Sequence, residues 1–135
     1  MTQSNRHTYA ALTTLIVLQL IMLSALYAGI RPHPPIATPL FGIAPFLGAS
    51  IGIALWAAIV QPLASTAGRA LSVLAALFAL VSFGPQKYFD PQFALIWPAV
   101  LFGQVSALVI FANVAGAIRA RSEASAASSA SARSA

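Results

Sequence analysis

The sequence has few of the side chains on which most catalytic sites depend. Cysteine is absent, and histidine occurs twice among 135 residues. The lack of cysteine excludes disulfides, thiol catalysis and cysteine-ligated metal. Charged residues make up 7% of the chain, against about 25% in an ordinary soluble domain. Because a soluble protein of this size needs a charged surface, the shortage of charge indicates a membrane protein.

The few titratable groups lie outside the middle of every long apolar run. Proton relays and cation transport through buried carboxylates therefore lack their usual side chains. His7 and His33 flank the first apolar run and cannot jointly hold one haem; we interpret His7 as a solvated edge residue, with an interfacial ligand as the alternative. Motifs of metal hydrolases, nucleophile elbows and phosphate-binding glycine loops are absent. We expect no cofactor, no metal and no catalytic residue.

What the chain has in abundance is apolar sequence, which makes up 59% of its residues. The longest uncharged run is Phe93 to Ile118, with 26 positions, and about 20 suffice to cross a bilayer core. Asp90 and Pro91 precede it with the signature of a helix start. Arg119 and Arg121 follow it, where positive charge favours a helix C-terminus. This run predicts a membrane-spanning helix at the centre of a bundle.

The other apolar runs complete an all-α integral membrane protein with four transmembrane helices. We predict spans at about residues 8–30, 41–61, 66–84 and 91–118. Residues 1–121 then form the membrane domain, and the Ala/Ser-rich tail at 122–135 is expected to be disordered.

Two of these runs leave alternatives open. The first resembles a secretory signal peptide with cleavage near Ser24, but its apolar run is longer than the usual 7–15 residues or so, which favours a retained helix. The third, Ala70 to Phe83, is short, and a re-entrant or tilted interfacial segment is the alternative to a full span.

The connectors differ in character. Residues 31–39 hold four prolines and predict an extended connector, with a lid or docking surface as the alternative. Residues 84–90 begin with Gly-Pro, which stops a helix. Lys87 and Asp90 in this second connector indicate a solvated pair or a helix cap rather than a catalytic dyad.

The basic residues set the expected orientation. With four spans, the head, the turn at 61–69 and the tail share one side of the membrane. Five basic residues fall on that side and two on the other: Arg6, Arg69, Arg119, Arg121 and Arg133 against Arg31 and Lys87. The excess predicts both termini in the cytoplasm, and we expect the plasma (inner) membrane of a bacterium. No dense basic patch is present, so no nucleic-acid partner is expected.

Small residues recur at helical spacing in two of the runs. Ala44, Gly48 and Gly52 are four residues apart, and so are Gly103 and Ala107. In lipid, such stripes allow close approach of another helix. We expect helix packing at both, within the chain or between subunits.

Three amide side chains lie inside predicted spans: Gln19, Gln104 and Asn113. The last two are nine residues apart, or about 180° around a helix, which disfavours one pore lined by both. Gln19 and Gln104 sit near mid-depth of their helices, and we expect them to pair across the bundle. Lining of a ligand path is the alternative.

Two classes of function remain. The first is a non-catalytic structural or assembly subunit of a larger membrane complex, or a self-associating scaffold, with lipid and either a protein partner or further copies as its contacts. The second is an oligomeric carrier or channel for an uncharged or weakly polar solute, with the amides along a water-filled path. An integral-membrane enzyme is a third and weaker candidate. The two main classes predict opposite environments for Gln19, Gln104 and Asn113.

Overall fold

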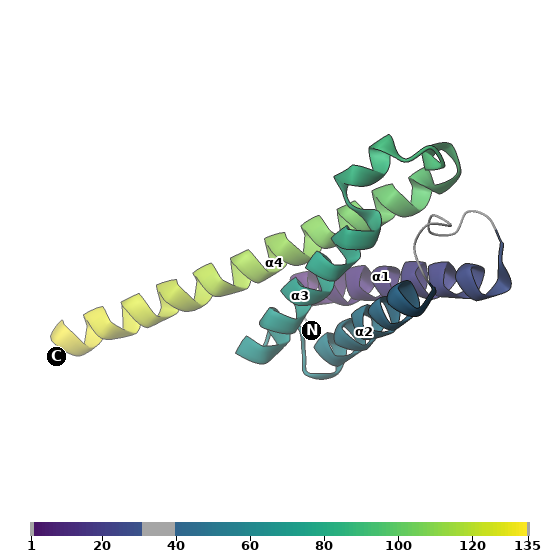
Figure 1. The fold of residues 1–135 in the computed structure, drawn as a ribbon. Coiled ribbons are helices and arrows are strands. Elements are labelled where there is room, and N and C mark those ends of the chain that lie inside the picture. Colours follow the sequence, from purple (N-terminus) through teal and green to yellow (C-terminus); the bar gives the residue numbers. More distant parts are fainter. Residues whose placement is uncertain (1, 31–39, 135) are drawn as a thin grey trace.

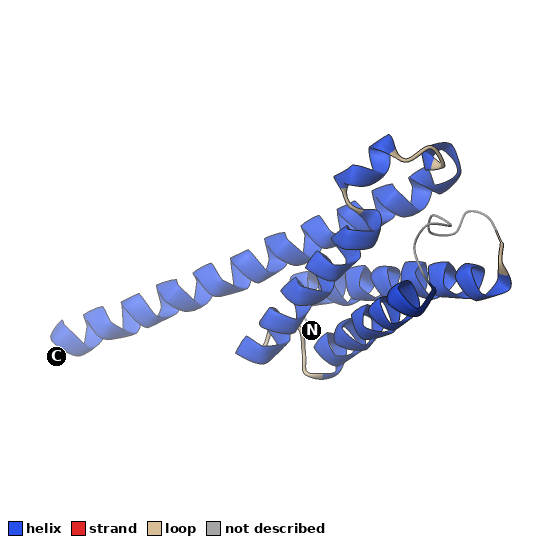
Figure 2. Cartoon of the chain, viewed as in Figure 1, coloured by secondary structure: helices blue, strands red, loops and turns tan. Residues whose placement is uncertain are grey.

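Helices are the only regular secondary structure in the part of the chain that the computed structural model describes, residues 2–30 and 40–134 (Figures 1 and 2). The proline-rich connector predicted at 31–39, with His33, lies outside the described residues.

Four long helices and one short 3-10 helix follow one another along the chain. They are α1 (Gln3–Ala28), α2 (Leu40–Ile59), α3 (Thr66–Phe83), η1 (Pro85–Phe89) and α4 (Phe93–Ser134). Each of the four α-helices is long and apolar enough to cross a membrane. Together they form a four-helix bundle, and four such helices in a chain this short indicate an integral membrane protein.

Polar side chains cap the starts of two of the helices. Thr2 accepts a hydrogen bond from the Asn5 N–H before α1, and Ser65 accepts one from the Gly68 N–H before α3. Helix α2 begins at Leu40, so that Pro45 lies inside it. A proline there removes one backbone hydrogen bond, which the rest of the helix has to tolerate.

The start of α4 also differs in detail from the expectation. Asp90 accepts a hydrogen bond from the Gln92 N–H at 2.9 Å, as a capping side chain does. The residues that follow form a turn, and the regular helix begins at Phe93.

One end of the bundle gathers the basic residues, and we call it the basic end. There the Asn113 side chain of α4 reaches the Ser4 carbonyl of α1, and Arg121 donates to the Ala64 carbonyl of the α2–α3 turn. The beginning of α1, that turn and the region where α4 leaves the bundle therefore lie at the same level. The opposite end carries η1, and we call it the η1 end (Figure 1).

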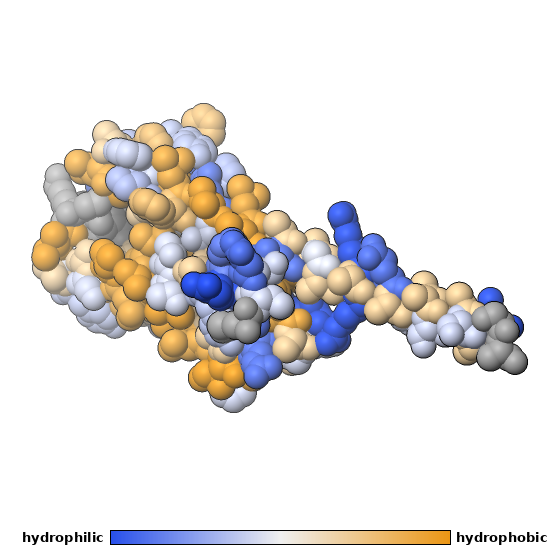
Figure 3. Space-filling model, turned by 180° about the vertical axis from the view of Figure 1, so that it is seen from behind, coloured by the Kyte–Doolittle hydropathy of each residue, from blue (hydrophilic) through white to orange (hydrophobic). Residues whose placement is uncertain are grey.

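The core is narrow and built largely from small side chains. Alanines of α2, α3 and α4 are packed with Leu12, Leu15 and Ile110 in one buried cluster. Large apolar side chains cover the outside instead, among them Phe41, Phe89, Leu95 and Leu108. Figure 3 shows the apolar surface spread over the bundle, with polar atoms gathered where α4 leaves it. Such an exterior is stable in lipid and unstable in water.

Helix α4 continues well beyond the bundle (Figure 1). We expected residues 122–135 to be disordered, whereas the structure has helix without a break to Ser134. The side chains of residues 119–133 are exposed. Alanine has the highest helix propensity of all residues, so the tail extends the helix without needing a packed face. The whole helix has 42 residues and is about 63 Å long.

Candidate functional site

The first of the three intramembrane amides, Gln19, joins α1 to α2. Its side-chain nitrogen donates to the Ser50 hydroxyl at 2.6 Å, and both side chains are almost completely buried. The predicted pairing of Gln19 with Gln104 is therefore wrong. The prediction rested on both amides lying near the middle of their helices. In the structure, Gln19 points to α2 and Gln104 points to α3. The Gln19 side-chain oxygen is buried and has no hydrogen-bond partner among the described residues.

The second amide, Gln104, ties α4 to the preceding segment. Its oxygen accepts from the Tyr88 hydroxyl at 2.8 Å, and its nitrogen donates to the Phe83 carbonyl at 3.1 Å. The Phe83 carbonyl lies in the last turn of α3, where no further helical N–H can reach it. Gln104 thus caps the end of α3 from the side and holds η1 against α4.

The third amide, Asn113, ties α4 to the beginning of α1. Its nitrogen donates to the Thr8 hydroxyl at 3.1 Å and to the Ser4 carbonyl at 3.2 Å. Thr8 in turn donates to that same carbonyl at 2.8 Å. The three amides therefore meet three different neighbours, and the structure brings no two of them together.

The small residues of α4 lie in close contact within the chain. A Cβ added to Gly103 would lie 2.7 Å from the Phe83 Cβ, so only glycine allows α3 and α4 this separation. Ala107 is buried in the core one turn further along.

The small residues of α2 are in the opposite situation. Gly48 and Gly52 are exposed, and a Cβ added to either meets no atom of the described part of the chain within 4 Å. Packing of these two glycines within the chain, one of our two interpretations, is therefore wrong. Ala44, at the same spacing, is half-buried. Exposed large apolar side chains flank the glycines, namely Phe41, Leu55, Trp56 and Ile59. We call this surface the open α2 face. Packing between subunits stays a prediction.

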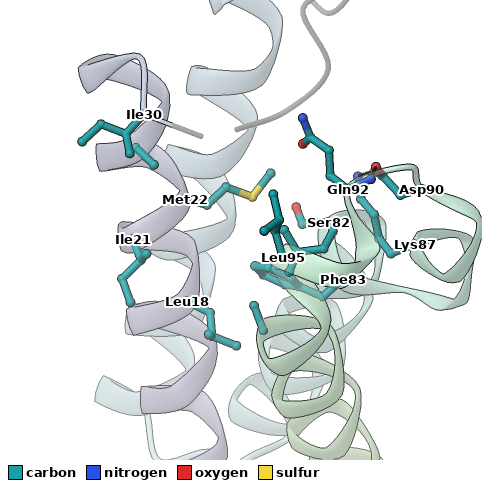
Figure 4. A pocket seen from close by; sticks show the side chains of 13 residues that line it. Leu18, Ile21, Met22, Ile30, Ser82, Phe83, Lys87, Asp90, Gln92 and Leu95 are labelled. Atoms are coloured by element: carbon teal, nitrogen blue, oxygen red, sulfur yellow. Dashed lines mark hydrogen bonds and ion pairs between the residues drawn. The ribbon is translucent and has the colours of Figure 1, made fainter. Parts of the chain in front are cut away.

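An apolar cleft opens between α1, α3 and α4 at the η1 end, with a volume of about 360 Å³. In Figure 4, Met22 of α1 and Leu95 of α4 point toward each other across it. Leu18 and Phe83 lie deeper, and Lys87, Asp90 and Gln92 stand at its upper edge (Figure 4). None of the three intramembrane amides lines this cleft.

The polar edge of the cleft is an ion pair held in place by the backbone. The Lys87 ammonium lies 3.1 Å from one Asp90 carboxylate oxygen, and the other oxygen accepts the Gln92 N–H. The hydrogen bond from Gln92 is the largest cause that lowers the pKa of Asp90 below its ordinary value of 3.8; Lys87 acts in the same direction, and desolvation opposes both. Asp90 is therefore both a helix cap and an ion-pair partner, the two roles expected from its sequence position.

A buried arginine at the basic end was read from sequence only as an orientation signal. Arg69 is 8% exposed, and its guanidinium donates to the Leu63 carbonyl and the Thr66 hydroxyl. These two hydrogen bonds from the charged guanidinium hold the turn that precedes α3. The polar signal was visible in the sequence as Ser65 and Thr66, which are typical of a helix start.

Other contributors could not be found from sequence. Ser50 and Thr8 partner the amides, but serine and threonine in a membrane helix also bond to their own backbone, so their positions alone carried little information. Within residues 2–30 and 40–134, no three His, Cys, Asp or Glu side chains form a group able to hold a metal ion.

Comparison with protein-family models, with curated proteins and with solved structures found no match for this chain. The fold defines the class of the protein, an all-α bundle of four helices that are each able to span a membrane.

Proposed function

We propose that this protein is a non-catalytic integral membrane subunit that assembles with another membrane helix, either of a larger complex or of a further copy of itself. The observation that carries the proposal is a difference between two sets of residues, the intramembrane amides and the small residues of α2. The amides are used in contacts inside the chain, while the two glycines of the open α2 face have no neighbour among residues 2–30 and 40–134.

The use of the amides favours a structural role over a solute path. A carrier or channel for a polar solute needs its amides along one water-filled route. Here each amide binds a different helix, and the bonds at Gln19 and Asn113 cross between helices. Interhelical hydrogen bonds of this kind are worth about 0.6 kcal/mol on average in lipid, and up to about 1.7. They stabilise the bundle and are not available for a solute without breaking it.

The open α2 face has the features of a helix-docking surface in lipid. Gly48 and Gly52 form a smooth track, and Trp56 lies one step further along it with 56% of its surface exposed. Association of helices in a bilayer depends on close packing rather than on a hydrophobic drive, and small residues permit that closeness. Aromatic side chains beside such a track add contact area.

The proposed orientation has both termini in the cytoplasm, in the inner membrane of a bacterium. The contacts that gather Ser4, Ala64 and Arg121 at the basic end support this orientation. They bring Arg6, Arg69, Arg119 and Arg121 to one side, where the positive-inside preference applies to all of them together.

The test is the mass of the native particle, measured after extraction from the membrane in mild detergent. We expect the wild-type chain to co-migrate with a larger membrane protein or to form a defined homo-oligomer. Gly48→Leu with Gly52→Leu should abolish that association and leave the fold intact, because no atom of the described residues lies within 4 Å of where the new side chains begin.

Gly116→Leu is the matched control. Gly116 is also exposed, and a Cβ there also meets nothing within 4 Å, but it lies on α4 near the basic end. A control that dissociates the particle as well would remove α2 from the proposal. A wild-type chain that is monomeric in detergent and in nanodiscs would overturn the proposal itself.

A further inference from the structure

We infer that the cleft between α1, α3 and α4 binds one phospholipid whose zwitterionic headgroup carries a primary amine, of the phosphatidylethanolamine class. The inference concerns a different surface from the open α2 face and stands independently of the assembly proposal.

The walls of the cleft fit an acyl chain. They are formed by aliphatic and aromatic side chains, including Leu18, Met22, Phe83, Leu95 and Ile96. The volume of about 360 Å³ lies within the range of about 300–1,000 Å³ that is typical of small-molecule sites. An apolar cavity of this size excludes a polar solute and suits a hydrocarbon chain.

The cleft is accessible from the bilayer. Ile21 of α1 and Leu95 of α4 both line it, and they are 60% and 64% exposed. Because the two helices that carry them are both membrane spans, the side opening faces hydrocarbon. A lipid can therefore enter sideways with its tail already in an apolar medium.

The charges at the edge of the cleft are complementary to a zwitterion. Lys87 and Asp90 place one cation and one anion 3.1 Å apart at the end of the apolar walls. The Lys87 ammonium can donate to a lipid phosphate, and Asp90 can accept hydrogen bonds from a primary ammonium. A choline headgroup has no N–H to donate, and a glycerol headgroup has no cation. The pair therefore ranks ethanolamine above choline and glycerol headgroups.

The level of the pair in the bundle agrees with a headgroup. Lys87 and Asp90 lie between two membrane spans, beside the exposed rings of Tyr88 and Phe89. Aromatic and amphipathic side chains gather at the membrane–water interface, where lipid phosphates also lie. The charged edge and the apolar walls thus match the two parts of one lipid in the order in which the bilayer presents them.

The test uses native mass spectrometry of the full chain with added phosphatidylethanolamine, phosphatidylcholine or phosphatidylglycerol carrying the same acyl chains. We expect phosphatidylethanolamine to be retained about tenfold more strongly than phosphatidylglycerol, as one charge-assisted hydrogen bond implies. Asp90→Asn should remove this preference. Asparagine can still accept the Gln92 N–H, so the helix start remains capped.

Two further variants separate the headgroup from the tail. Lys87→Gln should weaken all three lipids, since each has a phosphate. Ala99→Phe fills the cleft, which Ala99 lines, and should also weaken all three. Its control is Ala112→Phe, an exposed alanine of the same helix, which should change nothing. Thermal unfolding of each variant verifies that it is folded.

The inference is overturned if the three lipids bind equally, if folded Asp90→Asn keeps the preference, or if folded Ala99→Phe retains lipid as the wild type does. Capture of a second copy or of another protein chain in the cleft, lost in Ala99→Phe, would likewise replace the lipid with a different occupant.

Discussion

Two stretches of this protein have nearly the same pattern of small residues but opposite surroundings. Gly103 and Ala107 of α4 lie in the seam with α3, where an added Cβ on the glycine would come within 2.7 Å of Phe83. Gly48 and Gly52 of α2 have the same spacing, and an added Cβ meets no atom within 4 Å. The spacing therefore shows which side of a helix is smooth, but not what covers it.

The difference between the two stretches comes from their neighbours. A buried Phe83 fills the space that Gly103 leaves, and Gln104 fixes the end of α3 beside it. No described side chain does the same for the open α2 face. Substitutions in the seam should therefore affect folding, and substitutions on the open α2 face should affect association.

The largest effect is expected from Gly103→Ala, which breaks the seam. The added methyl group overlaps the Phe83 Cβ, an atom that cannot move without its backbone. Overpacking of this kind typically costs about 1–3 kcal/mol. The measurement is reversible unfolding in mixed micelles. Gly48→Ala is the control and should leave the free energy of unfolding unchanged or raise it by up to about 1 kcal/mol, because alanine favours a helix more than glycine does. Equal changes in the free energy of unfolding for Gly103→Ala and Gly48→Ala would show that the two glycines do not differ in their packing.

A smaller loss is expected from Gln104→Leu, which removes both amide bonds of the seam. We predict a loss of about 1 kcal/mol in the free energy of unfolding, in keeping with interhelical bonds in lipid. Tyr88→Phe deletes only the bond to the Gln104 oxygen and should cost about half as much. Solute flux in reconstituted vesicles is the companion measurement. Lost flux with unchanged stability would support the carrier alternative instead.

The pH dependence of stability tests the contribution of Asp90, which lies between η1 and α4. The pKa of Asp90 is lowered in the folded protein, so ionised Asp90 stabilises the fold above the ordinary carboxyl pKa of 3.8. This contribution is lost as the pH falls through the lower, folded-state pKa. Between pH 6 and pH 2, the stability difference between wild type and Asp90→Asn should therefore shrink. A difference independent of pH would show that the charge of Asp90 does not contribute.

The smallest effect on folding is expected from Trp56→Leu on the open α2 face. Trp56 is more than half exposed, and surface substitutions outside special features usually stay within about 0.5 kcal/mol. Its unfolding should match the wild type in conditions where the chain is monomeric. A marked loss of stability there would mean that the face is covered within the chain after all.

The sequence predicted the elements well where one strong physical signal governed them. Uncharged runs of sufficient length produce helices in lipid whatever their neighbours, because every backbone polar group must be satisfied within the segment. Asp90 was expected to form a solvated pair with Lys87 or to cap a helix; in the structure it accepts the Gln92 N–H before α4 and also pairs with Lys87, with both side chains less than one fifth exposed. These signals are local, so one stretch of chain contains all the information they need.

The partners of the amides could not be predicted in the same way. Gln19 and Gln104 share a level, but the direction in which each points depends on how the helices are rotated and which helices are adjacent. Ser50 was visible as a polar residue in a span, yet nothing local connected it with Gln19. The cleft was equally hidden, because it arises from the separation of α1 and α4 above their contact at Asn113.

The sequence by itself determined the four apolar helices. It also determined that most basic residues lie in the head, in the turn at 61–69 and after the fourth span. Length, hydropathy and charge act residue by residue against the bilayer, and they need no knowledge of packing. Only the tertiary structure decided which small residues are covered, which helix each amide binds and where the apolar cleft opens. Those features depend on the rotation and separation of neighbouring helices, which are set by the packing of all four together.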